Sequence, residues 1–288
     1  MLAAGLAVAA VSGLYFGPWF PLSLREWWGF FRACPKLIPL KEDAVYQLTI
    51  VIPARHSESQ EAVQRTVDAL LHNSAFPANL HLVVVHQNAA NVVIRFQGFG
   101  SGKVIPSPMG GEGRGCTLNE GVRRSDNSSL LLFCHADTKL PKQFDVLVAN
   151  CLRNESVIMC AFEFGLDSTR WRHQFVAHAA NFRSRFWWMP YGDQALAFRG
   201  PVFHSLGGFR EDYQMMEDFD LVQRARSRCL LSNNQEQLVI LPHSVQTSSR
   251  RWDERGIMKT TAWNWFFCAA YMYLHLSPKE IFKLYYSD

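Results

Sequence analysis

Four short runs of apolar residues constrain the fold of this chain more than any other feature. They are Leu48–Ile52 (LTIVI), Leu80–Val85 (LHLVVV), Leu130–Cys134 (LLLFC) and Val157–Phe162 (VIMCAF). Segments with helical spacing separate them. Continuous apolar strands that alternate with helices are typical of a mostly parallel sheet with helices on both faces. The sequence therefore predicts an α/β fold.

The first helix follows the first run. Ser57 and Gln60 form a capping-box pattern, and apolar residues recur at helical spacing from Glu58 to His72. These signals predict a helix over Glu58–His72. Further predicted helices are Arg114–Arg124, Lys142–Leu152, Arg172–Phe186, one starting near Glu217 and Thr260–Leu276. Further predicted strands are Ala195–Phe198 and Leu238–Leu241.

Composition limits the function classes. The chain has 288 residues, of which 48% are hydrophobic, so one large or two small domains can bury a core. A net charge of +4 is compatible with an anionic substrate such as a diphosphate and is too weak to indicate a nucleic-acid partner. The seven cysteines lack zinc-ligand spacing. They indicate buried thiols in a reducing compartment.

The N-terminus is hydrophobic. Residues 1–24 carry no charged side chain, and Arg25 and Arg32 follow. Such a length fits a membrane anchor, with the rest of the chain in the cytosol. A targeting peptide or an arm packed on the domain are the alternatives, which correspond to an organelle-targeted or a soluble cytoplasmic protein. We predict a linker over residues 25–47 and one domain over residues 48–288.

Ligands of open α/β sheets bind beyond the carboxyl ends of the strands. The residues to search are therefore Pro53–Glu58, His86–Asn88 and His135–Thr138, each just after an apolar run. A Rossmann dehydrogenase is excluded because PARHSES, without a glycine-rich turn, follows the first strand. A serine hydrolase is excluded because no G-x-S-x-G elbow is present.

The residues after the third run carry the strongest chemical signal. His135 and Asp137 follow the strand directly, in LLLFCHADTKLP. A carboxylate there needs a partner. A divalent cation that also binds a nucleotide diphosphate is such a partner, since Mg²⁺ uses few protein carboxylates. The alternative is a capping or turn aspartate ahead of Pro141.

An acidic group opens a predicted helix. Glu217, Asp218 and Asp220 lie within four residues. Negative charge at a helix N-terminus is favourable, so capping is one interpretation. Crowding also raises a carboxylate pKa towards that of a general base, which a sugar transfer needs to take the acceptor proton.

Two basic segments are candidates for holding phosphate. The glycine-rich stretch Gly110–Gly115 contains Arg114, but it lacks the Gly-Lys-Ser/Thr of a P-loop, and a flexible loop is the alternative. Arg250, Arg251 and Trp252 could hold a diphosphate and stack on a ring, or form a solvated basic turn.

In this order, the segments resemble family 2 glycosyltransferases, most closely the bacterial group named radical-SAM/selenodomain-associated transferase 2. The resemblance runs from about Leu48 to the C-terminus. The matching pieces are LTIVIPARHSES, GRGCTLNEGV, LLLFCHADTKLP, YGDQALAFR, LGGF, MEDFDLVQRAR, SSRRW and the tail after Gly256.

The resemblance implies a GT-A fold, a Rossmann-like α/β architecture, and an inverting, metal-assisted transfer from a nucleotide-sugar to an unidentified acceptor. Asp137, with His135, would hold Mn²⁺ or Mg²⁺. Asp218 would be the base, beside Glu217. The implied donor-binding residues are Pro53, Arg55, Glu58, Arg114, Asn119, His135, Arg250, Arg251 and Trp252. The implied sugar or acceptor residues are Tyr191, Gly192 and Asp193.

One segment departs from that family. Its members usually carry an Asp-rich turn with Gly or Ser after the second strand, whereas this chain reads VVVHQNAANVV, with His86, Gln87 and Asn88. A non-catalytic binding or scaffold protein with the same fold is therefore the alternative. A third interpretation is a membrane-bound transferase with a lipid-linked acceptor, which the apolar first segment and the aromatic tail suggest.

Overall fold

A computed structural model of the chain describes residues 46–55, 57–108, 113–125, 129–232 and 235–286. The chain divides into two compact units, which are described separately below. One unit is Ala33–Ser249, and the other combines Met1–Arg32 with Arg250–Asp288. The predicted domain over residues 48–288 extends over parts of both.

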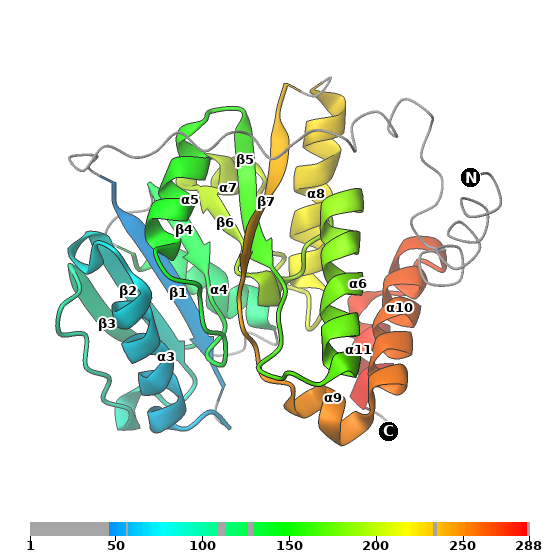
Figure 1. The fold of residues 1–288 in the computed structure, drawn as a ribbon, viewed down its shortest axis with the longest axis horizontal. Helices are drawn as coiled ribbons and strands as arrows, with labels where there is room; N and C mark the ends of the chain where they lie inside the picture. Colours follow the sequence, from blue (N-terminus) through cyan, green and yellow to red (C-terminus); the bar gives the residue numbers. More distant parts are fainter. Residues whose placement is uncertain (1–45, 56, 109–112, 126–128, 233–234, 287–288) are drawn as a thin grey trace. The chain divides into compact units, whose positions relative to one another are not determined.

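The first unit is built on one seven-stranded sheet in the order β3-β2-β1-β4-β6-β5-β7 (Figure 1). Its strands are β1 (Leu48–Ala54), β2 (Leu80–His86), β3 (Ser101–Pro106), β4 (Leu130–Phe133), β5 (Val157–Glu163), β6 (Ala197–Arg199) and β7 (Gln237–Ser244). β1 pairs in parallel with β2 and β4, and β5 with β7. Only the short β6 runs antiparallel to its neighbours β4 and β5. The predicted mostly parallel sheet is confirmed.

Helices cover both faces of this sheet (Figure 1). They are α3 (Gln60–Asn73), α4 (Arg114–Arg123), α5 (Phe144–Arg153), α6 (Trp171–Trp187), α7 (Gly200–Ser205) and α8 (Glu217–Leu231). Neighbouring side chains of a strand point to opposite faces. Ile50 and Ile52 join a cluster that contains Val63 of α3 and Val148 of α5. Val51 faces the other way, towards Gly121 of α4. Both faces of β1 are therefore buried from solvent, which explains its continuous apolar sequence.

The start of α3 differs from the prediction. The helix begins at Gln60, and its N-cap is Ser59, whose hydroxyl accepts a hydrogen bond from the Ala62 N–H. The carboxylate of Glu58 instead accepts from the Arg55 N–H at 2.6 Å. This bond closes a turn before the helix. The predicted N-cap, Ser57, was therefore wrong by two residues.

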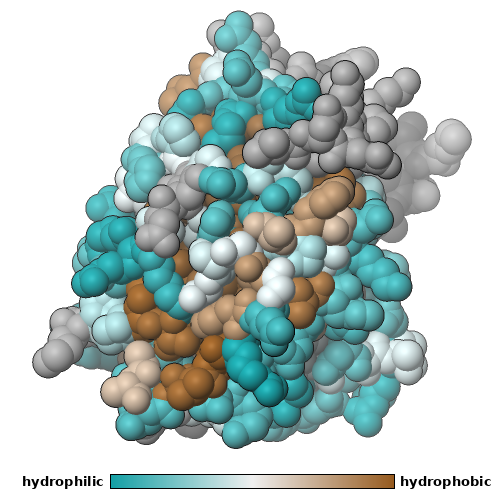
Figure 2. Space-filling model, turned by 90° about the vertical axis from the view of Figure 1, so that its left-hand side faces the viewer, coloured by the Kyte–Doolittle hydropathy of each residue, from teal (hydrophilic) through white to brown (hydrophobic). Residues whose placement is uncertain are grey.

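The edge strand β3 was not predicted from the sequence. It is half-exposed along much of its length, and Gly102 lies under the ring of Phe96. Figure 2 faces the side of the sheet where β3 lies and shows a patch of hydrophobic surface bordered by hydrophilic residues. A strand of this kind lacks the continuous apolar pattern of β1 or β2, so its sequence resembles a loop.

The described part of the second unit is helical. It contains α9 (Arg250–Arg255), α10 (Ile257–Tyr273) and α11 (Pro278–Tyr286). Trp263 stacks on Phe267 of α10, and Tyr285 of α11 lies edge-on to the same Phe267. Among the described residues, no helix has the length and hydropathy needed to cross a bilayer. The predicted hydrophobic segment over residues 1–24 lies outside the described residues.

A buried carboxylate ties the first unit together at the far end of α3. Asp145, in the first turn of α5, has no exposed surface. It accepts hydrogen bonds from the Phe76 N–H (2.8 Å), the Ser74 hydroxyl (2.6 Å) and the Tyr46 hydroxyl (2.9 Å). Burial and the Asp145 charge both raise the pKa of Tyr46 above its usual range. Asp145 therefore links α5, the α3–β2 connection and the start of β1.

We expect Asp145→Ala to lower the free energy of unfolding by about 3 kcal/mol, because several buried donors lose their acceptor. Chemical denaturation measures this change. Asp68→Ala, at an exposed position of α3, is the control and should change stability by no more than about 0.5 kcal/mol. Equal effects of the two substitutions would contradict the assigned role of Asp145.

Candidate active site

Arg114 connects three segments that lie far apart in the sequence. It is the first residue of α4. Its Nε donates a hydrogen bond to Glu217 of α8. Its Nη1 lies 2.9 Å from His135 Nε2, just beyond β4, and its Nη2 lies 3.4 Å from Asp218 Oδ2. We call these four residues the Arg114 cluster. A guanidinium only donates, so His135 Nε2 is the acceptor.

Asp218 is held by backbone as well as by Arg114. Its Oδ2 accepts from the Gly192 N–H and its Oδ1 from the Phe219 N–H, both at 2.8 Å. A Cβ at position 192 would lie 2.8 Å from that Oδ2, so only glycine allows this approach. Asp218 keeps a partly exposed side chain. A fixed carboxylate that solvent can still reach is suited to accepting a proton.

Glu217 differs from its neighbour in burial. Only 2% of it is exposed. Burial raises the pKa of Glu217, and the charge of Asp218 adds to this, whereas Arg114 lowers it. Burial acts to lower the pKa of Arg114, but the same two carboxylates, together with Asp193, outweigh it and raise that pKa. The residue before Glu217, Met216, has a φ of 69°, a conformation that costs a non-glycine residue energy and is common at functional sites.

A second acidic pair lies at the ends of β1 and β4. Burial raises the pKa of Glu58, and the nearby charge of Asp137 raises it further. Asp137 itself is exposed. His86, buried at the end of β2, accepts the Asn88 N–H at its Nδ1 (2.9 Å), and its Nε2 lies 3.3 Å from the Glu58 carbonyl. Because β2, β1 and β4 are neighbours, their ends bring these residues together.

The turn after α6 lies next to Asp218, which it contacts through the Gly192 N–H. Its 3₁₀ helix, η4, spans Gly192–Gln194. The buried amide of Gln194 accepts from the Ser184 hydroxyl (2.7 Å) and donates to the Phe162 carbonyl (2.8 Å). The Arg183 guanidinium lies 3.5 Å from the centre of the Tyr191 ring. No sequence signal indicated the anchoring roles of Gln194 and Arg183, although Gln194 lies within YGDQALAFR.

Solved structures share this architecture. A mannosyltransferase from Pyrobaculum calidifontis in complex with GDP-Man and Mn²⁺ matches with a TM-score of 0.58 and 15% identity, over 91% of this chain and 71% of that chain. S. aureus TarS with UDP-GlcNAc matches at 0.50 and 12% identity, over 70% and 58%. GalNAc-T7 with UDP, GalNAc and Mn²⁺ matches at 0.51 and 13% identity, over 72% and 44%.

The chain has the GT-A fold. At these identities the likeness shows the fold alone, and this confirms the predicted fold class. The aligned part spans 58% of the TarS 1–349 chain and 44% of the GalNAc-T7 chain. No protein-family model matches the sequence, and no curated protein matches it by sequence.

In this GT-A fold, the side-chain amide of Asn119, a predicted donor-binding residue, forms hydrogen bonds within the protein. Its Nδ2 donates to the Phe209 carbonyl and to Glu211, both at 2.8 Å, and its Oδ1 accepts from the Phe209 N–H. The amide therefore fixes the LGGF segment on α4. Its predicted donor contact stays a prediction, as does that of Arg55, whose side chain is exposed, and of Pro53, which is half-buried in β1.

The glycine-rich stretch also has a structural function. A Cβ at Gly113 would lie 1.9 Å from the Tyr213 carbonyl oxygen. The glycine thus lets the start of α4 approach the loop before α8, which places Arg114 beside Glu217. Residues 109–112 lie outside the described residues. Arg250, Arg251 and Trp252 belong to the second unit, so their predicted role at this site stays a prediction.

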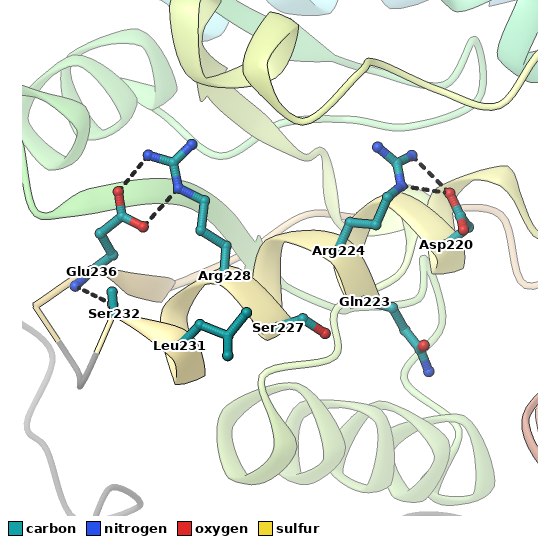
Figure 3. Close-up of a pocket in the computed structure, with 8 residues that line it drawn as sticks. All are labelled: Asp220, Gln223, Arg224, Ser227, Arg228, Leu231, Ser232 and Glu236. Atoms are coloured by element: carbon teal, nitrogen blue, oxygen red, sulfur yellow. Dashed lines mark hydrogen bonds and ion pairs between the residues drawn. The ribbon is translucent and has the colours of Figure 1, made fainter.

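A groove of about 540 Å³ runs along α8 beyond the Arg114 cluster (Figure 3). Its arginines already have partners. Arg224 pairs with Asp220 at 2.7 Å and donates to the Gly208 carbonyl, and Arg228 pairs with Glu236. The Arg224 bond attaches α8 to the LGGF segment, and the Arg228 pair attaches it to the residue before β7. The interactions that line the groove therefore hold in place the helix that carries Glu217 and Asp218.

The predicted metal site depends on Asp137. Among the described residues, no group of three His, Cys, Asp or Glu side chains could hold a metal ion. His135 Nε2 faces Arg114, so this nitrogen is not directed at a cation. Asp137 is an exposed carboxylate at the carboxyl edge of the sheet. It fits a cation that takes one or two carboxylates and completes its shell with substrate phosphates and water.

The raised pKa of Glu217 makes stability depend on pH. Between the pKa of the unfolded chain and the raised folded pKa, the native state binds more protons, so stability falls as pH rises through this window. We expect the free energy of unfolding of the wild type to decrease relative to that of Glu217→Gln as pH rises above the ordinary pKa of a glutamate. Denaturant titrations at several pH values measure it, with exposed Glu155→Gln as the control. A relative gain in stability over this window would contradict the assignment.

Proposed function

We propose that the protein is a glycosyltransferase that moves a sugar from a nucleotide-sugar donor to an acceptor hydroxyl with inversion. The observation that carries the proposal is the placement of Asp218. Backbone donors and Arg114 fix this carboxylate beside the strand ends of a GT-A fold, and it stays accessible. The structural neighbours are named as complexes with GDP-Man, UDP-GlcNAc and UDP, which supports a nucleotide-sugar donor.

In the proposed reaction, Asp218 accepts the proton of the acceptor hydroxyl. The acceptor oxygen then forms a bond to the anomeric carbon, while the bond from that carbon to the phosphate oxygen breaks. The nucleoside diphosphate leaves with the electron pair of the broken bond. Arg114 holds Asp218 in place and supplies positive charge close to the bond changes. Glu217 fixes Arg114 from the buried side.

Asp137 would hold a divalent cation, Mn²⁺ or Mg²⁺, on the donor diphosphate. Two neighbours are named as complexes with Mn²⁺, which supports this. When bound, such a cation neutralises charge on the departing diphosphate. The order of the sequence segments supports membership of family 2, most closely the radical-SAM/selenodomain-associated transferase 2 group.

One observation favours a second candidate, a non-catalytic GT-A protein that binds a nucleotide or serves as a scaffold. Both nitrogens of His86 and the Nε2 of His135 are engaged with protein atoms. At two strand ends, polar groups are thus satisfied without a ligand. This candidate predicts neither donor hydrolysis nor transfer.

The test is donor hydrolysis and transfer with Mn²⁺ and Mg²⁺ across a set of nucleotide-sugars. We expect Asp218→Asn to reduce the turnover rate by about 100-fold or more, because the positioned base is lost. Gly192→Ala should reduce it too, since its Cβ displaces Asp218. Asp212→Asn, on the exposed loop before α8, is the matched control and should retain activity.

Full activity of Asp218→Asn would contradict the assigned base. Nucleotide binding without any turnover in the wild type would support the non-catalytic candidate instead.

A further inference from the structure

Helix α6 has a buried face and, opposite to it, a face with exposed aromatic residues. The inner face buries His173, Ala177, Ser184 and Trp187 against the first unit. On the outer side, Trp171, Phe175 and Phe182 are 74%, 54% and 42% exposed. Their spacings of four and seven residues place them on one face of the helix. Single exposed apolar residues are ordinary, but a contiguous aromatic stripe indicates a binding surface.

The charges carried by α6 and the residue before it have one sign. No Asp or Glu occurs from Arg170 to Trp187, whereas Arg170, Arg172 and Arg185 are exposed. The guanidinium of Arg172 lies 5.4 Å from the centre of the Trp171 ring. Arg185 pairs with Glu163 of β5 at 2.7 Å, so part of the positive charge is compensated. An aromatic stripe flanked by arginines matches a surface that is apolar inside and anionic outside.

The second unit has a comparable helix face. Met258, Phe266 and Tyr273 of α10 are exposed at spacings of eight and seven residues. Lys259 is the only charged residue of α10. This face is independent of α6, and it shows the same combination of exposed apolar side chains with positive charge.

We propose that the outer face of α6 docks on the surface of an anionic lipid bilayer. Aromatic rings would lie at the level of the headgroups, and the arginines would contact lipid phosphates. A second copy of the chain fits this face less well. A two-fold contact through α6 would bring the arginines of both copies together, with no acidic residue on the helix to offset them.

The position of the docked face indicates which kind of acceptor can reach the site. Four residues after the end of α6, Tyr191 begins the turn that places the Gly192 N–H on Asp218. Docking through α6 would therefore hold the acceptor side of the site near the bilayer. Resting on the proposed function, this makes the acceptor a hydroxyl carried by a lipid in the same membrane.

A fluorescent label on α6 tests the docking directly. The full chain receives Phe175→Cys, labelled with a polarity-sensitive dye, in a Cys34→Ser background. The other six cysteines are described and buried. The control label is Val93→Cys, at an exposed residue near β3, at the opposite edge of the sheet from β7, which α6 contacts. Vesicles contain phosphatidylcholine alone, or equal parts of phosphatidylcholine and phosphatidylglycerol.

We expect the dye at position 175 to shift to shorter wavelength with the anionic vesicles, less so at high salt, and the dye at position 93 to stay unchanged. A dye at 175 that remains in water on vesicle-bound protein would overturn the proposal. So would equal shifts at both positions, or no vesicle binding. A shift that appears without vesicles as protein concentration rises would indicate self-association and would also overturn it.

Substitutions supply a second measurement. Trp171→Ser, Phe175→Ser and Phe182→Ser together should weaken binding to the anionic vesicles by about tenfold or more. Phe76→Ser, Val93→Ser and Leu231→Ser together, at other exposed positions, should not. Similar binding by both triple variants would overturn the proposal. Nucleotide binding by the same variants is measured separately. Its absence throughout, with vesicle binding intact, would count against the proposed function and leave the docking in place.

Discussion

The candidate site depends on one ion pair, between Arg114 at the start of α4 and Glu217 at the start of α8. Glu217 is almost fully buried, and an unpaired carboxylate there would be strongly destabilising. Arg114 provides the partner and uses its remaining donors on His135 and Asp218. The pair therefore fixes two helix N-termini and the residues after β4 relative to one another. Without it, Asp218 would keep its backbone donors but would lose the guanidinium that links it to α4 and to the residues after β4.

Several conformational requirements at other positions follow from this pair. Position 113 requires glycine because the α4 start approaches the Tyr213 carbonyl. Met216 adopts a left-handed conformation so that Glu217 and Asp218 can begin the helix there. Gly192 is required on the opposite side of Asp218. Arg224 attaches the rest of that helix to the LGGF segment, and Arg228 attaches it to Glu236, just before β7. A chain that only needed a stable fold would have no reason to keep a strained residue beside a buried charge.

The sequence predicted the central strands well because β1, β2, β4 and β5 are buried on both faces, which leaves a continuous apolar signal. It did not predict β3, whose edge position tolerates Gly102 and Lys103. It placed the α3 start at Glu58, because the hydrogen bond from the Arg55 N–H to that carboxylate is a feature of the turn and has no sequence signature. Segment order placed Arg114, His135, Glu217 and Asp218 among the site residues, but not their mutual contacts. Pairings between residues about 100 positions apart depend on the folded topology.

The central claim is that these strand ends bind a nucleoside diphosphate through a cation on Asp137. Calorimetric titration of UDP and GDP into the full chain, with and without Mn²⁺, tests it most directly. The account predicts that at least one nucleotide binds in the presence of Mn²⁺, and that binding weakens by about tenfold or more without the metal or in Asp137→Ala. Binding of neither nucleotide, or binding that is equally tight without metal and in Asp137→Ala, would contradict it.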